Sequence, residues 1–350
     1  MQSQSSRKVV VLDPVADPRW YGLIRSNSGA GFFHHPAWLA LLAHYYKFKT
    51  FALCVEQGGV LIAGIPFCEV GVLPLRRKKW VCLPFSDHCG PLTLSPDDSS
   101  YLVDHAIARA LSLGIRLEIR HSLGADSGCE RSRDYCLHVA DLELEPGRLM
   151  KRLKSGVKGS IKKGHKNDLK TENRRDMEAV EIFYRIHLKT RRKQGVPIQP
   201  RRVFTLLHQY IIEGGLGFIS LTRIKTRYIS AGVFCGFNGT ITYKYGASDP
   251  ACLDVSPNHL MLWDTMLHAR QEGFSRFDFG RTDLSNAGLR FFKSGWNTKE
   301  TELSYSYFPT APSAGLLDWV SKKVVEPTIR HSPQIVCRMA GEALYKHFGA

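Results

Sequence analysis

The order of helical and extended segments constrains this fold most strongly, because two successive parts of the chain have a similar combination of helices and strands. The first block is residues 36–141 and the second is residues 147–308. Each contains helical stretches and short strands, in which apolar residues either alternate with polar ones or follow one another without a break. Strands joined by short turns, with helices between some of them, are typical of an α+β unit with a mixed, largely antiparallel sheet. The sequence therefore predicts two α+β units in succession.

Apolar periodicity gives approximate positions for the elements. In the first block, helices are expected at residues 36–45 and 101–113, and strands at residues 51–55, 60–70, 80–83, 115–120 and 135–141. In the second block, helices are expected near residues 147–170, 176–194, 200–213 and 256–271, and strands near residues 216–223, 227–237, 239–246, 275–279 and 302–308. Ser256 as N-cap and Pro257 as first helical residue are expected to start the last of these helices.

The length of the chain supports a division into domains, since 350 residues exceed what one hydrophobic core usually holds. We expect an N-terminal domain at residues 1–145, a C-terminal domain at residues 146–310, and a tail at residues 311–350 with two short helices separated by Pro327 and Pro333. The tail carries an apolar stripe made of Leu316, Leu317, Val320 and Val324. Such a stripe packs against a domain or lies on a membrane surface, and both readings stay open.

The net charge of +16 points to an anionic partner, because a basic surface attracts polyanions. Nucleic acid, anionic lipid, CoA and nucleotide-sugar phosphates all qualify, and a basic protein without such a partner is the alternative. The nine cysteines include no CxxC pair and argue against a disulfide framework, which favours a reducing cytoplasm. We expect neither export nor a membrane span, because the chain shows no apolar leader and no run of 18 apolar residues.

Positive charge is concentrated in one segment. Residues 148–175 contain eleven Lys or Arg against two acidic residues, which places +9 of the net charge there. In a helix, the four-residue spacing would give an apolar stripe of Leu149, Leu153, Val157 and Ile161 beside a lysine row of Lys154, Lys158, Lys162 and Lys166. The lysine row is expected to bind phosphates, and a solvated face is the alternative. Three glycines in the segment weaken a continuous helix.

Other kinds of site find no support in the sequence. Cys82, His88 and Cys89, or Cys129, Cys136 and His138, match no standard zinc spacing, so no metal is expected. The glycines and lysines of the basic segment do not form a P-loop, and there is no GxSxG motif. The helix from Ser256 also lacks the glycine-rich lead-in of an ordinary CoA pyrophosphate loop.

Several stretches resemble the FemAB-like acyltransferases, two-domain relatives of the GNAT fold. They are, in chain order, "FFHHPAWL", "LPFSDHCGPL", "LKSGVKGSIKKG", the "YGAS" strand, Asn258 ahead of a helix with Trp263, "FDFGR", and "GLRFFKSGW" with Lys293. The resemblance covers roughly residues 30–310. It implies two tandem GNAT-like (acyl-CoA N-acyltransferase-like) domains and a transferase that moves an aminoacyl group onto a cell-wall precursor, or an acetyltransferase linked to polysaccharide export.

Such a reaction needs a base for the attacking amine and a stabiliser for the tetrahedral oxyanion. In "FDFGR", Phe277 and Phe279 are expected to face the core while Asp278 faces the opposite side, towards a groove. Asp278 is therefore the candidate base, and pairing with Arg276 or a lysine purely for folding is the alternative. Gly280 is expected to end the strand in an abrupt turn.

The resemblance supplies two further catalytic candidates. Lys293 is expected at the acyl carbonyl or at a donor phosphate. Asp87, in the loop "PFSDHCGPL", is a second base or an acceptor-binding residue, with a turn role as the alternative.

Five residues are candidates for substrate binding and one more for phosphate binding. Tyr243 and Tyr245 are expected on one side of their strand, beside the acceptor or in the core. Asn258 and Ser256 are placed to hold one phosphate at the helix start, and Arg281 and Asp283 are expected to line the rim of the site.

These expectations define an acyltransferase without a tightly bound cofactor or a metal. The donor is aminoacyl-tRNA or acyl-CoA, and the acceptor is an amine of a cell-envelope precursor or a polysaccharide intermediate. tRNA and the anionic inner face of the membrane are possible partners, and DNA is not expected as one. A non-catalytic module that holds RNA or anionic lipid is the alternative from another class.

Overall fold

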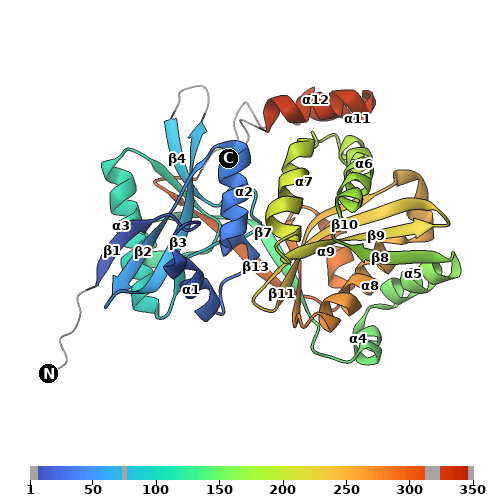
Figure 1. Cartoon of the computed structure of the whole chain (residues 1–350), viewed down its shortest axis with the longest axis horizontal. Coiled ribbons are helices and arrows are strands. Elements are labelled where there is room, and N and C mark those ends of the chain that lie inside the picture. Colours follow the sequence, from blue (N-terminus) through green and yellow to red (C-terminus); the bar gives the residue numbers. More distant parts are fainter. Residues whose placement is uncertain (1–6, 73–76, 312–323, 346–350) are drawn as a thin grey trace. The chain divides into compact units, whose positions relative to one another are not determined.

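The computed structural model describes residues 7–72, 77–311 and 324–345, and their contacts divide them into two compact units (Figure 1). Unit 1 contains the described residues up to Tyr135 together with Glu302–Ala311, and unit 2 contains Cys136–Thr301 with residues 324–345. Strands β7 (Glu130–Asp141) and β13 (Lys299–Phe308) therefore each have residues in both units. The domain boundaries expected from the sequence stay a prediction.

Unit 1 is a mixed sheet with helices packed on it. Its strands follow the order β1 (Lys8–Leu12), β2 (Lys49–Gln57), β3 (Val60–Val72), β4 (Arg77–Cys82), β6 (Arg116–Ile119) and β13, with β5 (Leu92–Thr93) on β3. All of these pairs are antiparallel except β4 with β6. The helices are α1 (Pro18–Ser26), α2 (Pro36–Tyr46) and α3 (Pro96–Ser112). The strand β1 and the helix α1 were not expected from the sequence.

The strands of unit 2 pair in a similarly mixed way. Its strands follow the order β12 (Arg276–Asp283), β11 (Thr240–Ser248), β10 (Arg227–Phe237), β9 (Gly217–Ile224) and β8 (Leu169–Arg174). The β11–β12 pair is parallel, and the other pairs are antiparallel. The mixed, largely antiparallel α+β architecture predicted from the sequence is confirmed in both units.

Helices cover the sheet of unit 2 on two sides (Figure 1). The helices of this unit are α4 (Pro146–Arg152), α5 (Ser155–Lys166), α6 (Met177–Gln194), α7 (Arg201–Leu207), α8 (Pro257–Gln271), α9 (Ala287–Ser294), α11 (Glu326–His331) and α12 (Gln334–Leu344). Helix α6 packs on β9, β10 and β11, and α8 packs on β8, β9 and β10 with α5 beside it. The tail helices α11 and α12 pack on α6.

The basic segment is not the continuous helix that the sequence predicts. Leu153 and Lys154 have extended backbone angles and separate α4 from α5, and β8 begins at Leu169. The predicted apolar stripe survives this break, because Leu149, Leu153, Val157 and Ile161 are all buried in the core of unit 2. Leu316, Leu317 and Val320 of the predicted tail stripe lie outside the described residues, and Val324 is exposed.

Candidate functional site

Asp278 lies in the middle of β12, where the apolar residues alternate as predicted. Phe277 and Phe279 are buried in the hydrophobic core of unit 2, in contact with each other at 4.7 Å between ring centroids. Asp278 between them is only 2% exposed and points to the opposite face of the sheet. A buried carboxylate needs hydrogen-bond donors, and its Oδ1 accepts one from the backbone N–H of Gly280 at 2.7 Å.

Gly280 does not end the strand, and this part of the sequence prediction is wrong. β12 continues through Gly280 to Asp283, because glycine adopts a left-handed φ of 71° without ending the strand. In this conformation its N–H binds Asp278, and its carbonyl accepts a hydrogen bond of 2.7 Å from Lys293 Nζ. Lys293 Nζ also donates to the carbonyl of Arg281 at 3.3 Å.

The structure therefore brings together two of the predicted catalytic residues. Lys293 lies on α9, is 5% exposed, and reaches Asp278 through the two backbone groups of one glycine. These residues lie where two parallel strands stop pairing. The register of β11 and β12 covers Thr240–Thr242 with Arg276–Asp278, and both strands then continue beyond it.

A second group of polar side chains lies within reach of the charge of Lys293. Cys136 Sγ lies 3.9 Å from His138 Nδ1, and His138 Nε2 lies 2.9 Å from Glu300 Oε2. Arg290 on α9 binds the same carboxylate, with 2.7 Å between Nη2 and Oε1. Burial lowers the pKa of His138, and the positive charge of Lys293 lowers it further. The two-residue spacing of Cys136 and His138 on β7 is a sequence signal for this group, whereas Glu300 and Arg290 carry none.

Helix α9 also contacts the start of the basic helix. The N–H of Lys154 donates to the carbonyl of Gly295 at 3.0 Å, and Lys154 Nζ donates to Ser294 Oγ at 2.9 Å. The first member of the predicted lysine row thus lies beside the C-terminal end of the helix that carries Lys293.

The rest of the lysine row lies on the surface of α5. Lys158 is half-buried and donates to the carbonyl of Lys151 at 2.9 Å, and Lys162 and Lys166 are exposed. The row is accessible, and phosphate binding by it stays a prediction.

Tyr243 and Tyr245 do not share one face of β11, contrary to the sequence prediction. Tyr243 stacks on Phe234 at 4.9 Å and packs against the core cluster that includes α8. Tyr245 contacts Phe183 of α6 and Phe204 of α7. The register of β10 and β11 shifts between Val233 and Phe234, and such a bulge turns the residues on its two sides to opposite faces.

At the start of α8, the side chain of Asn258 makes the hydrogen bonds that the side chain of the N-cap residue does not. Ser256 is the N-cap residue and Pro257 the first residue of α8, as predicted, but Ser256 has a left-handed φ of 60° and its side chain makes no capping hydrogen bond. Ser256 is also the C-cap residue of the short helix Pro250–Val255, which leads directly into α8. Asn258 Oδ1 accepts a hydrogen bond of 2.6 Å from Ser230, and its Nδ2 donates to Ser248 at 3.3 Å.

Arg281 and Asp283 lie at the end of β12. Arg281 is half-buried, and its carbonyl is the one that Lys293 contacts. Asp283 is exposed, and its Oδ1 accepts a hydrogen bond of 2.9 Å from the N–H of Ser285, which shapes the turn into α9. Their role at the rim of a substrate site stays a prediction.

Asp87 belongs to unit 1, in the loop that follows β4. The loop is anchored by buried Arg120, whose Nη1 donates to the carbonyl of Ser86 at 2.7 Å and whose Nε donates to Glu118 at 3.0 Å. The carbonyl of Asp87 accepts a hydrogen bond of 2.7 Å from the hydroxyl of Tyr305. These contacts hold the loop in place, and a catalytic role of Asp87 stays a prediction.

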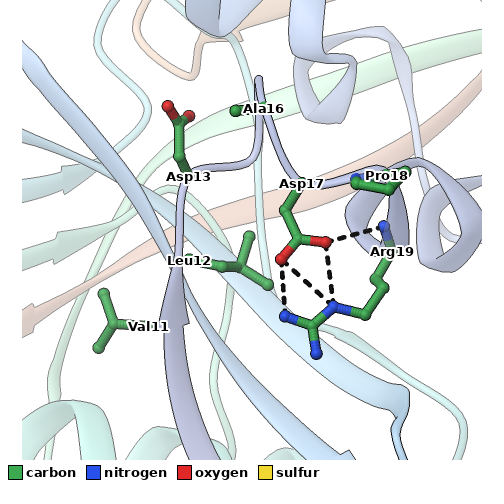
Figure 2. Close-up of a pocket in the computed structure, with 7 residues that line it drawn as sticks. All are labelled: Val11, Leu12, Asp13, Ala16, Asp17, Pro18 and Arg19. Carbon is green, nitrogen blue, oxygen red and sulfur yellow. Dashed lines mark hydrogen bonds and ion pairs between the residues drawn. The ribbon is translucent and has the colours of Figure 1, made fainter.

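A surface hollow of about 610 Å³ lies elsewhere in unit 1, between the end of β1 and the start of α1 (Figure 2). Figure 2 shows Asp17 bound to Arg19, and the Asp17 side chain also caps α1 through the N–H of Arg19 at 3.0 Å. None of the residues that line this hollow is a predicted site residue. Across the described ranges, none of the helices has both the length and the apolar character that crossing a bilayer requires.

Comparisons with known proteins agree with the fold. Residues 151–293 match the family model of the acetyltransferase (GNAT) domain. A stretch of 116 residues is 29% identical to the lipid II:glycine glycyltransferase of Staphylococcus aureus, covering 31% of this chain and 28% of that protein. The match thus spans less than a third of the curated relatives' length.

Two solved structures resemble the chain over most of its length. The crystal structure of FemX matches with a TM-score of 0.66 at 14% sequence identity, over 81% of this chain and 94% of that one. A tandem GNAT protein from the clavulanic acid biosynthesis pathway matches with a TM-score of 0.52 at 11% identity, over 88% of this chain and 100% of that one. The predicted fold of two tandem GNAT-like domains is confirmed. Residues 151–293 are thus similar to a GNAT acetyltransferase domain, and the chain shares its fold with FemX.

Proposed function

We propose that this chain is an acyltransferase that moves an activated acyl or aminoacyl group onto an amine of a cell-envelope or polysaccharide precursor. One observation carries the proposal: a buried carboxylate and a buried ammonium are held on the two backbone groups of Gly280, where β11 and β12 stop pairing. The GNAT match over residues 151–293 includes all three of these residues, which supports an acyl-transfer site in unit 2.

The chemistry requires a proton acceptor and an anion stabiliser. The nitrogen lone pair of the acceptor amine forms a bond to the acyl carbon, and the carbonyl electrons move to oxygen. Lys293 stabilises this oxyanion, and Asp278 takes the proton from the amine. Collapse of the intermediate breaks the bond to the leaving oxygen or sulfur, which then takes up a proton. Asp87 remains a second candidate for the base.

Phosphate groups of the donor or the acceptor would lie on the lysine row. Lys154, Lys162 and Lys166 are exposed, and Lys154 contacts the helix of Lys293, so a phosphate chain on the row would lie near the reacting carbonyl. The aromatic ring of Phe291 is 75% exposed beside Lys154, with 5.6 Å between Nζ and the ring centroid. An exposed ring next to a cation is suited to stacking a nucleotide base.

The donor and acceptor follow from different observations. The Staphylococcus aureus relative is a lipid II:glycine glycyltransferase, and this similarity supports a cell-envelope acceptor and an aminoacyl donor. The GNAT domain match favours acyl-CoA as donor, as in an N-acetyltransferase of exopolysaccharide synthesis. A module that binds RNA or anionic lipid without catalysis is the second candidate function, favoured by the +9 net charge of residues 148–175.

The test is a transfer assay with two donors and a binding control. Purified chain is incubated with acetyl-CoA or with aminoacyl-tRNA and a UDP-linked or lipid-linked wall precursor, and products are identified by mass spectrometry. Transfer from either donor is expected, and the Lys293→Ala variant should turn over about 10² to 10³ times more slowly. Lys299→Ala, an exposed lysine of the same unit, is the matched control and should keep full activity.

Two outcomes would contradict the proposal. Thermal stabilisation by tRNA or vesicles without transfer from any donor would favour the non-catalytic module. Unchanged turnover in Lys293→Ala would remove this lysine from the mechanism. Lys293 also donates a hydrogen bond to Gly280, so its loss could lower stability. The unfolding temperature of each variant is therefore measured together with its activity.

A further inference from the structure

The strand β1 lies at one end of the strand order in unit 1. It pairs with β2 over Lys8–Leu12, and its other side pairs with no strand among the residues that the structure describes. Backbone N–H and C=O groups on that side therefore lie outside the ladder of sheet hydrogen bonds. An edge of this kind can accept a further extended strand, and the sequence of β1 indicates which strand fits.

The side chains of β1 alternate between the two faces of the sheet. Leu12 is buried, which identifies the face of the even-numbered residues as the covered one. Val9 and Val11 lie on the other face, where Val9 is half-buried and Val11 is 47% exposed. Extended by one residue at each end, the same alternation places Arg7 and Asp13 beside the two valines. This face of β1 thus has an apolar centre, a basic end and an acidic end.

An antiparallel pair of two β1 strands matches apolar residues with apolar residues and opposite charges with each other. With Val10 opposite the Val10 of a second copy, Val9 of each copy lies opposite Val11 of the other. The same register sets Arg7 of each copy opposite Asp13 of the other. The arrangement has two-fold symmetry, so each of these pairs occurs twice. Four valines flanked by two ion pairs would then lie on one face of the joined strands.

The charged ends also select the direction of pairing. A parallel, in-register pair would set Arg7 against Arg7 and Asp13 against Asp13, and like charges directly opposite each other are destabilising. The Nη1 of Arg7 lies 3.4 Å from Asp98 Oδ1, but 42% of the arginine side chain is exposed. Asp13 is exposed, and its Oδ1 accepts a hydrogen bond of 2.9 Å from the N–H of Val15. Both side chains keep donor or acceptor groups for a partner across the edge.

The surface hollow at the end of β1 adds apolar area to this edge (Figure 2). Its lining includes Val11, Asp13 and Ala16. In the antiparallel pair, Val11 and Asp13 are the residues that lie opposite Val9 and Arg7 of the second copy. The second copy would therefore lie against the rim of this hollow, at both ends of the pair.

We propose that two copies of this chain pair along β1 and extend the sheet of unit 1 across a two-fold axis at Val10. The occupant of the edge is a second copy, because the charges and apolar residues of β1 complement their own reversed order. A paired edge of five residues is small beside the roughly 1,200–2,000 Å² of a stable interface, so we expect a reversible dimer whose population rises with concentration. None of the candidate site residues lies in β1, so the inference holds whether or not the chain transfers acyl groups.

The test is the mass of the purified full chain, measured by light scattering and by sedimentation at increasing protein concentration. The mass should rise from one chain to two and stop there, because pairing uses the open edge of each copy. The Asp13→Arg variant sets like charges opposite each other at both ends of the pair. It should raise the dissociation constant of the dimer about tenfold or more.

A second variant tests the apolar centre of the edge. Val11→Lys places a charge on the exposed face, as natural edge strands do to prevent pairing, and should weaken the dimer in the same way. Asp104→Arg makes the same change of charge as Asp13→Arg at an exposed position of α3, and should leave the dissociation constant unchanged. Circular dichroism and thermal unfolding check that each variant folds.

Hydrogen exchange shows whether β1 is the interface. At a concentration where the dimer dominates, the amide protons of residues 8–12 should exchange more slowly in the natural chain and in Asp104→Arg than in Asp13→Arg. A mass of one chain at every concentration, or growth beyond two chains, would overturn the proposal. A dimer that tolerates both Asp13→Arg and Val11→Lys would overturn it as well.

Discussion

A single glycine links the two central side chains of the candidate site. Gly280 has a φ of 71°, and in this conformation its N–H meets Asp278 while its carbonyl meets Lys293. An L-residue with a side chain adopts such a φ at a cost of about 1–2 kcal/mol. The identity of this residue therefore decides both the local backbone and the positions of the two charged groups.

Gly280→Ala is expected to lower the free energy of unfolding by about 1–2 kcal/mol and to reduce acyl transfer as well. The matched control is Gly114→Ala, since Gly114 has a φ of 62° and open space around the position of an added Cβ. The control should lose similar stability in urea titrations but keep its activity. Equal activity losses in both variants would show that Gly280 matters for folding only.

His187 on α6 predicts a pH-dependent stability. Its ring stacks on Phe183 at 5.0 Å, and burial, with a further contribution from the charge of Arg191, lowers its pKa to about 3. The pKa in the unfolded chain is about 6.5, so between the two values the unfolded state binds one proton more. The stabilising contribution is thus complete above about pH 6.5 and is lost as the pH falls, by up to about 1.4 kcal/mol per pH unit.

Urea unfolding at pH 7 and pH 5 measures this contribution. The natural chain should lose about 2 kcal/mol more than the His187→Gln variant over that interval. The same substitution at exposed His105 serves as the control and should leave the pH dependence unchanged. A His187→Gln variant with the same pH dependence as the natural chain would contradict the assignment.

At the scale of elements, helix α5 has one apolar face, which is buried, and one basic face, which is exposed. Its buried residues Val157 and Ile161 pack in the core beside α8, and its glycines fall into two kinds. A Cβ at Gly164 would lie 3.0 Å from Leu260 Cβ, whereas a Cβ at Gly156 or Gly159 would meet nothing within 4 Å. Only Gly164 is therefore needed for the close approach of α5 to α8.

Alanine substitutions should separate these two kinds of glycine. Gly156→Ala and Gly159→Ala are each expected to raise the free energy of unfolding by about 0.4–1 kcal/mol, because alanine has less conformational freedom to lose. Gly164→Ala should gain nothing or lose stability, because Leu260 must move. Thermal or urea unfolding of the three variants checks this, and a stabilising Gly164→Ala would contradict the packing.

At the scale of the whole molecule, charge is the property most accessible to measurement. Residues 148–175 hold +9 of the net +16, and they include the lysine row on the exposed side of α5. Neutralising phosphates with such a row releases counterions, so the logarithm of the affinity should fall linearly with the logarithm of the salt concentration.

Binding of a single-stranded RNA at several salt concentrations tests this expectation. Each lysine of the row that contacts a phosphate should lower the salt slope by about 0.7 when it is replaced with glutamine. Lys225→Gln, an exposed lysine on the turn between β9 and β10, removes the same charge outside the basic segment and should leave the slope unchanged. If Lys158→Gln and Lys162→Gln leave the salt slope unchanged, the lysine row does not bind phosphates and is only a solvated face.

What the sequence determined by itself is the local periodic part of the structure. The alternation of Phe277, Asp278 and Phe279 and the four-residue stripe from Leu149 to Ile161 predict buried faces correctly, because strand and helix repeats need only neighbouring residues. The tertiary structure alone decided that β12 continues past Gly280, since this depends on the hydrogen bond that Gly280 donates to Asp278 and the one it accepts from Lys293. A one-residue bulge placed Tyr243 and Tyr245 on opposite faces, and chain folding brought Glu300 to His138. Neither event leaves a pattern in the residues concerned, because each depends on how another strand lies beside them.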